Sequence, residues 1–116
     1  MQQQPNHRQL REFVSMSQWL TSSSFPLHLI RMDERTRDVF ILAGDILEIT
    51  IREDGQVYYD QTLHSDTSKA ELRDYVLKHR EDNEAFYKFS DRVRATAKPI
   101  DGDEFFQILA SASKYQ

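Results

Sequence analysis

The 116-residue sequence contains no cysteine, only three glycines and only three prolines. Without cysteine it can form neither a disulfide nor a thiolate centre, which is typical of a protein from a reducing cytosol. Three scattered glycines cannot supply the glycine-rich loop that cradles a nucleotide phosphate. We therefore expect a cytoplasmic protein and predict no cofactor.

Long hydrophobic runs are also missing. The longest apolar stretch covers 39–44, far short of the ~20 residues that a membrane-spanning helix needs. The first ten residues, MQQQPNHRQL, lack the apolar segment of a secretory signal peptide. We expect neither a membrane segment nor a secretory leader.

An excess of positive charge is absent as well. The chain carries 15 basic and 19 acidic residues, a formal net charge of −4, so it has no long-range attraction to nucleic acid or to an anionic membrane. What it does contain is a globular composition, with 39% hydrophobic and 11% aromatic residues. We predict a single compact domain over 1–116.

A helix is predicted over 7–21. Asn6 and Gln9 have the N-cap and N3 spacing of a capping box, and apolar residues then recur at helical intervals. Three serines at 22–24 favour local side-chain hydrogen bonds, and Pro26 forces the residue before it to be extended. The helix should end there and a strand should begin.

Residues 27–60 are predicted to form a four-stranded antiparallel meander, because the hydrophobic period is two and turn residues return about every ten positions. The expected strands are 27–32, 38–43, 46–51 and 56–60. The second strand is apolar on both faces, so we expect the N-terminal helix to cover one face and the C-terminal helices to help cover the other.

Two finer predictions concern the third strand and the turn after it. The period places Leu47, Ile49 and Ile51 on a packed face and Glu48, Thr50 and Arg52 on a face that sees water. The pair Asp54-Gly55 predicts a two-residue type I′ hairpin, since that turn needs positive φ at both central positions.

Three short helices are predicted after the meander, over about 69–79, 83–96 and 102–112. The first should start at a capping box of Ser68 and Glu71, and the last at one of Asp101 and Glu104. The first two should pair as a helical hairpin. The predicted fold class is α+β, with sub-units at 6–60 (helix plus meander) and 68–112 (helical part).

Two stretches of the sequence resemble known families. Residues 18–59, QWLTSSSFPLHLIRMDERTRDVFILAGDILEITIREDGQVYY, resemble a short uncharacterised family known mainly from cyanobacteria, with an apolar-x-Arg-x-Asp-x-x-Thr pattern followed by FILAG. Residues 71–93, ELRDYVLKHREDNEAFYKFSDRV, resemble a second such family, often encoded beside the first. The resemblance implies a fusion of two neighbours that act together, since linkage raises the effective concentration to the ~mM range. It implies no particular function.

One turn departs from the first family's pattern. Where that family usually has Gly-Asn after the threonine, this chain has Arg37-Asp38. If the turn requires a positive φ at Arg37, it carries strain of roughly 1 kcal/mol or more, and otherwise it takes another shape.

Candidate metal ligands are His64 with Asp66, and His79 near Asp82. Neither pair supplies the three converging ligands of a catalytic zinc site, so we interpret them as solvated or capping residues. The acidic segment 101–104 lacks the spacing of an EF-hand loop and is interpreted as a helix cap. We predict no metal site, no catalytic residues and no enzymatic activity, because the serines also lie in no nucleophile elbow.

The first functional hypothesis is a small accessory protein that contacts a protein partner or a second copy of itself. Short helices rarely bury both of their faces, and exposed aromatic side chains mark interfaces. Tyr75, Tyr87 and Phe106 are the candidates, since Tyr87 and Phe106 fall off the apolar stripes of their helices.

The alternative hypothesis is a nucleic-acid-associated regulator or antitoxin-like module. Its phosphate contacts would come from the helical hairpin and would be Arg73, Arg80, Lys88 and Arg92. Interleaved acidic residues leave 8 basic against 6 acidic side chains over 69–98, which favours a salt-bridged solvent face instead.

Overall fold

The computed structural model describes residues 4–100 and residue 107. Helix α1 is followed by four strands, two helices and a short final strand. Their bounds are α1 His7–Ser22, β1 Leu27–Asp33, β2 Asp38–Ala43, β3 Leu47–Ile51, β4 Val57–Gln61, α2 Thr67–Lys78, α3 Asn83–Thr96 and β5 Lys98–Pro99. The strands form one antiparallel sheet in the order β1-β2-β3-β4-β5. The predicted α+β class with an N-terminal helix is confirmed.

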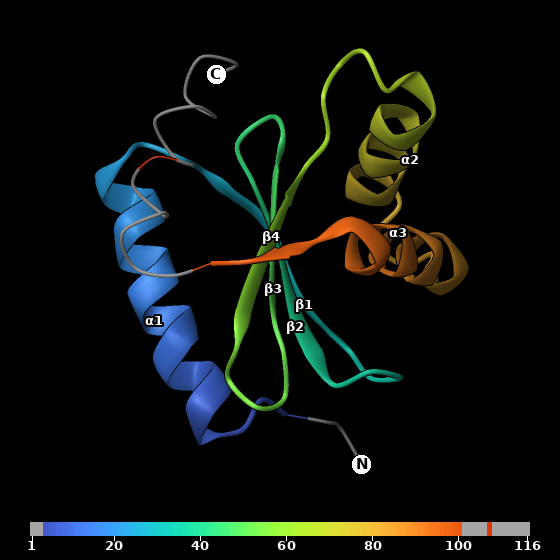
Figure 1. The fold of residues 1–116 in the computed structure, drawn as a ribbon. Coiled ribbons are helices and arrows are strands. Elements are labelled where there is room, and N and C mark those ends of the chain that lie inside the picture. Colours follow the sequence, from blue (N-terminus) through green and yellow to red (C-terminus); the bar gives the residue numbers. More distant parts are fainter. Residues whose placement is uncertain (1–3, 101–106, 108–116) are drawn as a thin grey trace.

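The molecule has three layers, with α1 on one face of the sheet and α2 and α3 on the other (Figure 1). All six residues of β2 are buried. Val39 and Ile41 belong to the apolar cluster on the α1 side, whereas Phe40 and Leu42 belong to the cluster on the α2 and α3 side. The prediction that helices cover both faces of this strand is therefore confirmed.

Helix α1 begins at the predicted capping box. The side chain of Asn6 accepts a hydrogen bond from the backbone N–H of Gln9, and the Gln9 side chain accepts one from the backbone N–H of Asn6. The side-chain nitrogen Nε2 of Gln9 also donates to the backbone carbonyl groups of Arg37 and Ile51, at 2.6 and 3.1 Å. The cap thus fixes the helix to the sheet, while Met16 and Leu20 fill the core above it.

The turn between β1 and β2 adopts the strained one of the two conformations considered for it, with a positive φ at Arg37. Arg37 has φ 64°, in the left-handed region that non-glycine side chains rarely occupy. Its backbone N–H donates to the carbonyl of Asp33 at 2.7 Å, and Gln9 holds its carbonyl. The surrounding hydrogen bonds keep Arg37 in a conformation that glycine or asparagine adopts more easily.

The prediction of a type I′ turn at Asp54-Gly55 is wrong. Gly55 has φ 89°, but Asp54 is not among the residues with positive φ. The backbone N–H of Arg52 donates to Gln56 and that of Gly55 donates to Arg52, which closes a three-residue loop with a left-handed glycine at its end. The Asp54 side chain accepts from the backbone N–H of Gln56 at 2.8 Å and stabilises this longer loop.

Other boundaries also differ from the prediction. The sheet has a fifth strand, because Lys98 and Pro99 pair with β4 instead of merely ending α3. A proline is compatible with this position, since the outer side of an edge strand needs no N–H donor. Helix α2 is capped by Asp66, not by Ser68, while α3 spans the predicted 83–96. The helix predicted over 102–112 lies outside the described residues.

A polar face was predicted for β3, and this is wrong. All five of its residues are buried, including Glu48 and Thr50. The residues of β3 do alternate between the two faces of the sheet, but α2 and α3 cover the face that was expected to be in contact with water.

Within the described part of the chain, no helix is long and apolar enough to cross a membrane.

Candidate functional site: a charged interface between the sheet and the helical hairpin

The most unusual group in the molecule is the carboxylate of Glu48. It points from the middle of β3 toward α2 and is 0% exposed. The Nε of Arg73 donates to its Oε2 at 3.0 Å, and the hydroxyl of Thr62 donates to its Oε1 at 2.6 Å. The ammonium of Lys69 lies 3.6 Å away. The buried carboxylate of Glu48 is thus surrounded by donors from two segments, α2 and the residue that follows β4.

Arg73 and Lys69 bring the compensating charge from α2. Arg73 is 6% exposed, and its Nη2 also donates to the backbone carbonyls of Ala43, Gly44 and Leu47 at 3.1–3.3 Å. Lys69 donates to the carboxylate of Asp60 at 2.7 Å. Two acids from the sheet, Glu48 and Asp60, therefore meet two bases from the helix in what we call the charged cluster.

Burial has a measurable electrostatic consequence for Glu48. Loss of water raises the pKa of its carboxyl group to about 7, although Arg73, Thr62 and Lys69 all act to lower it. The charged cluster is neutral when Glu48 is ionised, with two anions and two cations. Protonation of Glu48 leaves one positive charge in excess inside the protein.

On the α3 side of the hairpin, a base from the turn between β1 and β2 pairs with a helix acid. Arg35 donates to the carboxylate of Asp91 on α3 at 2.9 Å and to that of Asp33 at 2.8 Å. Asp33 is buried and also accepts from the hydroxyl of Ser90 at 2.8 Å. Burial acts to raise the pKa of Asp33, but the hydrogen bonds from Arg35 and Ser90 outweigh it and lower the pKa.

Between these two charged ends the contact is apolar. The ring of Phe40 meets Phe86 edge to face, with centroids 5.6 Å apart, and Phe89 at 5.9 Å. Leu42 from β2 and Val76 from α2 complete the packing. The interface between the sheet and the helical hairpin is thus an aromatic centre flanked on both sides by ion pairs.

A hollow of about 450 Å³ lies beside the charged cluster. Its lining includes Arg73 and Thr62 from the cluster, two histidines, His28 and His64, and Asp74. Among residues 4–100 and 107, no three histidine or acidic side chains converge in a way that could hold a metal ion. The hollow therefore offers polar groups but no recognisable catalytic arrangement.

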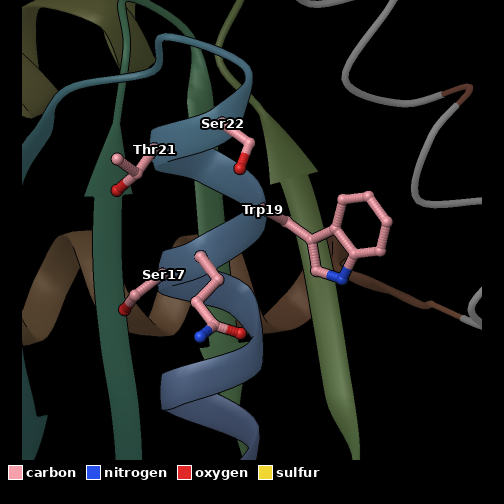
Figure 2. Close-up of a pocket in the computed structure, with 5 residues that line it drawn as sticks. Ser17, Trp19, Thr21 and Ser22 are labelled. Carbon is pink, nitrogen blue, oxygen red and sulfur yellow. The ribbon is translucent and has the colours of Figure 1, made fainter.

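A second hollow, of about 630 Å³, lies at the end of α1 (Figure 2). It is lined by Ser17, Gln18, Trp19, Thr21 and Ser22, all from one helix. Ser17 and Thr21 point to one side of the helix, whereas Trp19 points to the other. Side chains that diverge from one helix do not form a binding site.

The aromatic residues predicted for a protein interface lie in different surroundings. Tyr75 is 41% exposed, stacks on His79 and donates its hydroxyl to Asp82 at 2.9 Å. Tyr87 is half-buried and packs against the apolar cluster that contains Phe40 and Phe86. Its hydroxyl donates to Glu34. Phe106 lies outside the described residues. They do not form one patch.

The candidate nucleic-acid contacts are also separated. Arg73 is buried in the charged cluster, so its guanidinium is not available to a phosphate. Arg80 donates to the carbonyl of His28 at 2.6 Å, and Arg92 donates to Ser68 at 3.0 Å. Lys88 is exposed. Most of these cations tie the helical hairpin to itself or to the sheet.

The candidate metal ligands have capping roles. Asp66 accepts from the backbone N–H of Lys69 at the start of α2, and Asp82 accepts from that of Ala85 at the start of α3. This agrees with the interpretation of these acids as helix caps. Sequence reasoning missed the buried acids Glu48 and Asp33: alternation assigned Glu48 to a polar face, and Asp33 was placed in the turn after a strand predicted to end at residue 32, whereas β1 ends at Asp33.

Comparison with known proteins divides the chain at the linker between β4 and α2. Residues 4–58 match a domain of unknown function (DUF6888), and residues 66–114 match a family of unknown function (DUF6887). No curated protein and no solved structure matches the chain. The chain therefore carries adjacent matches to two families of unknown function, DUF6888 and DUF6887, which is consistent with a fusion of the two.

Proposed function

We propose that this is a small cytoplasmic, non-enzymatic accessory protein that acts by contacting another protein or a second copy of itself. The observation that carries the proposal is the exposure of large apolar side chains on the α1 side of the sheet. Leu10 and Val14, one helical turn apart on α1, are 47% and 54% exposed. Ile30 on the edge strand β1 is 47% exposed.

These three residues lie on the same side of the molecule. Ile30 is the register partner of Ile41, whose side chain packs in the cluster under α1. Cross-strand partners share a face of the sheet, so the exposed side chain of Ile30 lies on the α1 face of the edge strand β1. Exposed apolar groups gathered on one side of a small protein are typical of a contact surface.

The experiment compares self-association and cross-linking at this surface. Light scattering after size exclusion should show a concentration-dependent dimer that Val14→Ser with Ile30→Thr abolishes. A photoreactive residue at position 14 should give one discrete cross-linked product in cells, and the same residue at Glu81, an exposed position in the turn between α2 and α3, is the control. If the protein stays monomeric and position 14 gives no more product than position 81, the proposal is wrong.

The nucleic-acid alternative has less support, because Arg73, Arg80 and Arg92 are engaged within the protein. Fluorescence anisotropy with a labelled DNA duplex at low and at moderate salt tests it directly. We expect no binding above background even at low salt. Salt-sensitive binding that Lys88→Glu weakens would favour the regulator over the accessory protein.

A further inference from the structure

The interface between the sheet and the helical hairpin coincides with the boundary between the two families. One match ends at residue 58 and the next begins at 66. The pairs Glu48 with Arg73, Arg35 with Asp91, and Phe40 with Phe86 each join a residue before this boundary to one after it. Contacts that hold one protein together here connect two separate sequence units.

Neither unit by itself buries the apolar residues of this interface. Without the hairpin, the sheet would expose Phe40, Leu42 and the carboxylate of Glu48, all of which are fully buried in the intact chain. The hairpin consists of helices of 12 and 14 residues, and isolated helices of this length are marginal in water. Each unit therefore needs a cover of the shape and charge that the other provides.

The charges also specify the orientation of that cover. At one end the sheet contributes the acids Glu48 and Asp60 and the helix contributes the bases. Beside α3 the polarity is mixed, because Arg35 of the sheet side pairs with Asp91 while Arg94 of the helix pairs with Asp38 of the sheet. A hairpin docked in the reverse direction would separate these ion pairs and bring Asp91 toward Glu48 and Asp60, which selects against that orientation.

The covalent link between β4 and α2 contributes little to the interface between the sheet and the helical hairpin. It consists of residues 62–66, of which His64 and Ser65 are exposed. Its two ends are held by their own hydrogen bonds, from Thr62 to Glu48 and from the N–H of Lys69 to Asp66. A link of this kind raises the effective concentration of the hairpin but adds no binding surface.

We infer that this face of the sheet is a binding site for a helical hairpin delivered by a separate polypeptide, with two bases one turn apart on its first helix and an acid on its second. The occupant has the residue pattern of 66–97. The inference does not depend on the α1 surface, which lies on the opposite face of the sheet.

The test cleaves the folded full-length protein between the two units. A protease site replaces Leu63–Ser65, and the purified protein is cleaved after folding. We expect the two fragments to co-elute as a 1:1 species and, when isotopically heavy and light cleaved proteins are mixed, to exchange into mixed pairs that native mass spectrometry resolves. Fragments that separate or precipitate on cleavage, or that never exchange, would overturn the inference.

Charge variants show whether the exchange uses this interface. In the cleaved protein, Glu48→Ala should weaken fragment association about 30-fold or more, because it leaves the buried guanidinium of Arg73 without its carboxylate. If that variant does not fold, Asp91→Arg at an exposed position should still weaken association several-fold, because it sets two guanidinium groups against each other. Lys78→Glu, in the exposed pair with Asp74 away from the interface, should change nothing. Equal effects of Asp91→Arg and Lys78→Glu would contradict the proposed contact.

Discussion

Glu48 and Arg73 are separated by 25 positions in the sequence and by 3.0 Å in the structure, where both are buried. Each would be costly alone, because an ion removed from water must be compensated by partners. Together with Lys69 and Asp60 they form a neutral cluster between the two family segments. This pairing links the fold of the sheet to the position of the helices.

Removal of the Arg73 side chain should therefore destabilise the protein strongly. We expect Arg73→Ala to destabilise the protein by about 3–5 kcal/mol, because it leaves Glu48 buried with one partner fewer and releases three backbone carbonyls. The double variant Glu48→Gln with Arg73→Met should lose less, since no isolated charge remains. Urea denaturation followed by circular dichroism measures both. A double variant as unstable as the single one would contradict the role of the unpaired charge.

The raised pKa of Glu48 predicts a dependence of stability on pH. With a pKa near its ordinary value of 4.5 when unfolded and about 7 when folded, the native state binds more protons between these values. The free energy of unfolding should then fall as pH rises from about 5 to 8, by at most about 3 kcal/mol from this group. Glu48→Gln should reduce this slope.

Chemical denaturation at pH 5 and at pH 8 provides the measurement. Glu53→Gln, at an exposed position in the β3–β4 turn, is the matched control and should leave the slope unchanged. Asp33 acts in the opposite sense: its lowered pKa gives stability that is lost only as the pH falls below its ordinary value. The two groups therefore dominate different parts of the pH range.

Local sequence patterns predicted the elements of this fold but not its charged interface. The cap at Asn6 and the continuous apolar run of β2 depend on neighbours within a few positions, so α1 and the doubly covered strand were predictable. The burial of Glu48 depends on α2, which follows more than fifteen residues later. The same alternation that identified β3 placed Glu48 with Thr50 on a polar face, and only tertiary packing reverses that assignment.

The aromatic centre of the interface should contribute most of its apolar stability. Phe86 is 1% exposed and contacts Phe40 edge to face, so Phe86→Ala should cost about 3–5 kcal/mol through lost burial and the cavity it leaves. Tyr87→Ala, at the neighbouring half-buried position, should cost less. Thermal unfolding of both variants decides this, and equal losses would mean that Tyr87 is as much a part of the core as Phe86.

The left-handed conformation of Arg37 offers a stabilising substitution. Its side chain is exposed, so replacement removes no core packing, while asparagine occupies positive φ at lower energy. We expect Arg37→Asn to raise the free energy of unfolding by about 0.5–1 kcal/mol, and Arg37→Val to lower it, because a β-branched side chain tolerates this backbone worst. Urea titration of both variants tests the sign. If asparagine and valine shift the stability in the same direction, loss of the arginine side chain, and not backbone strain, governs this turn.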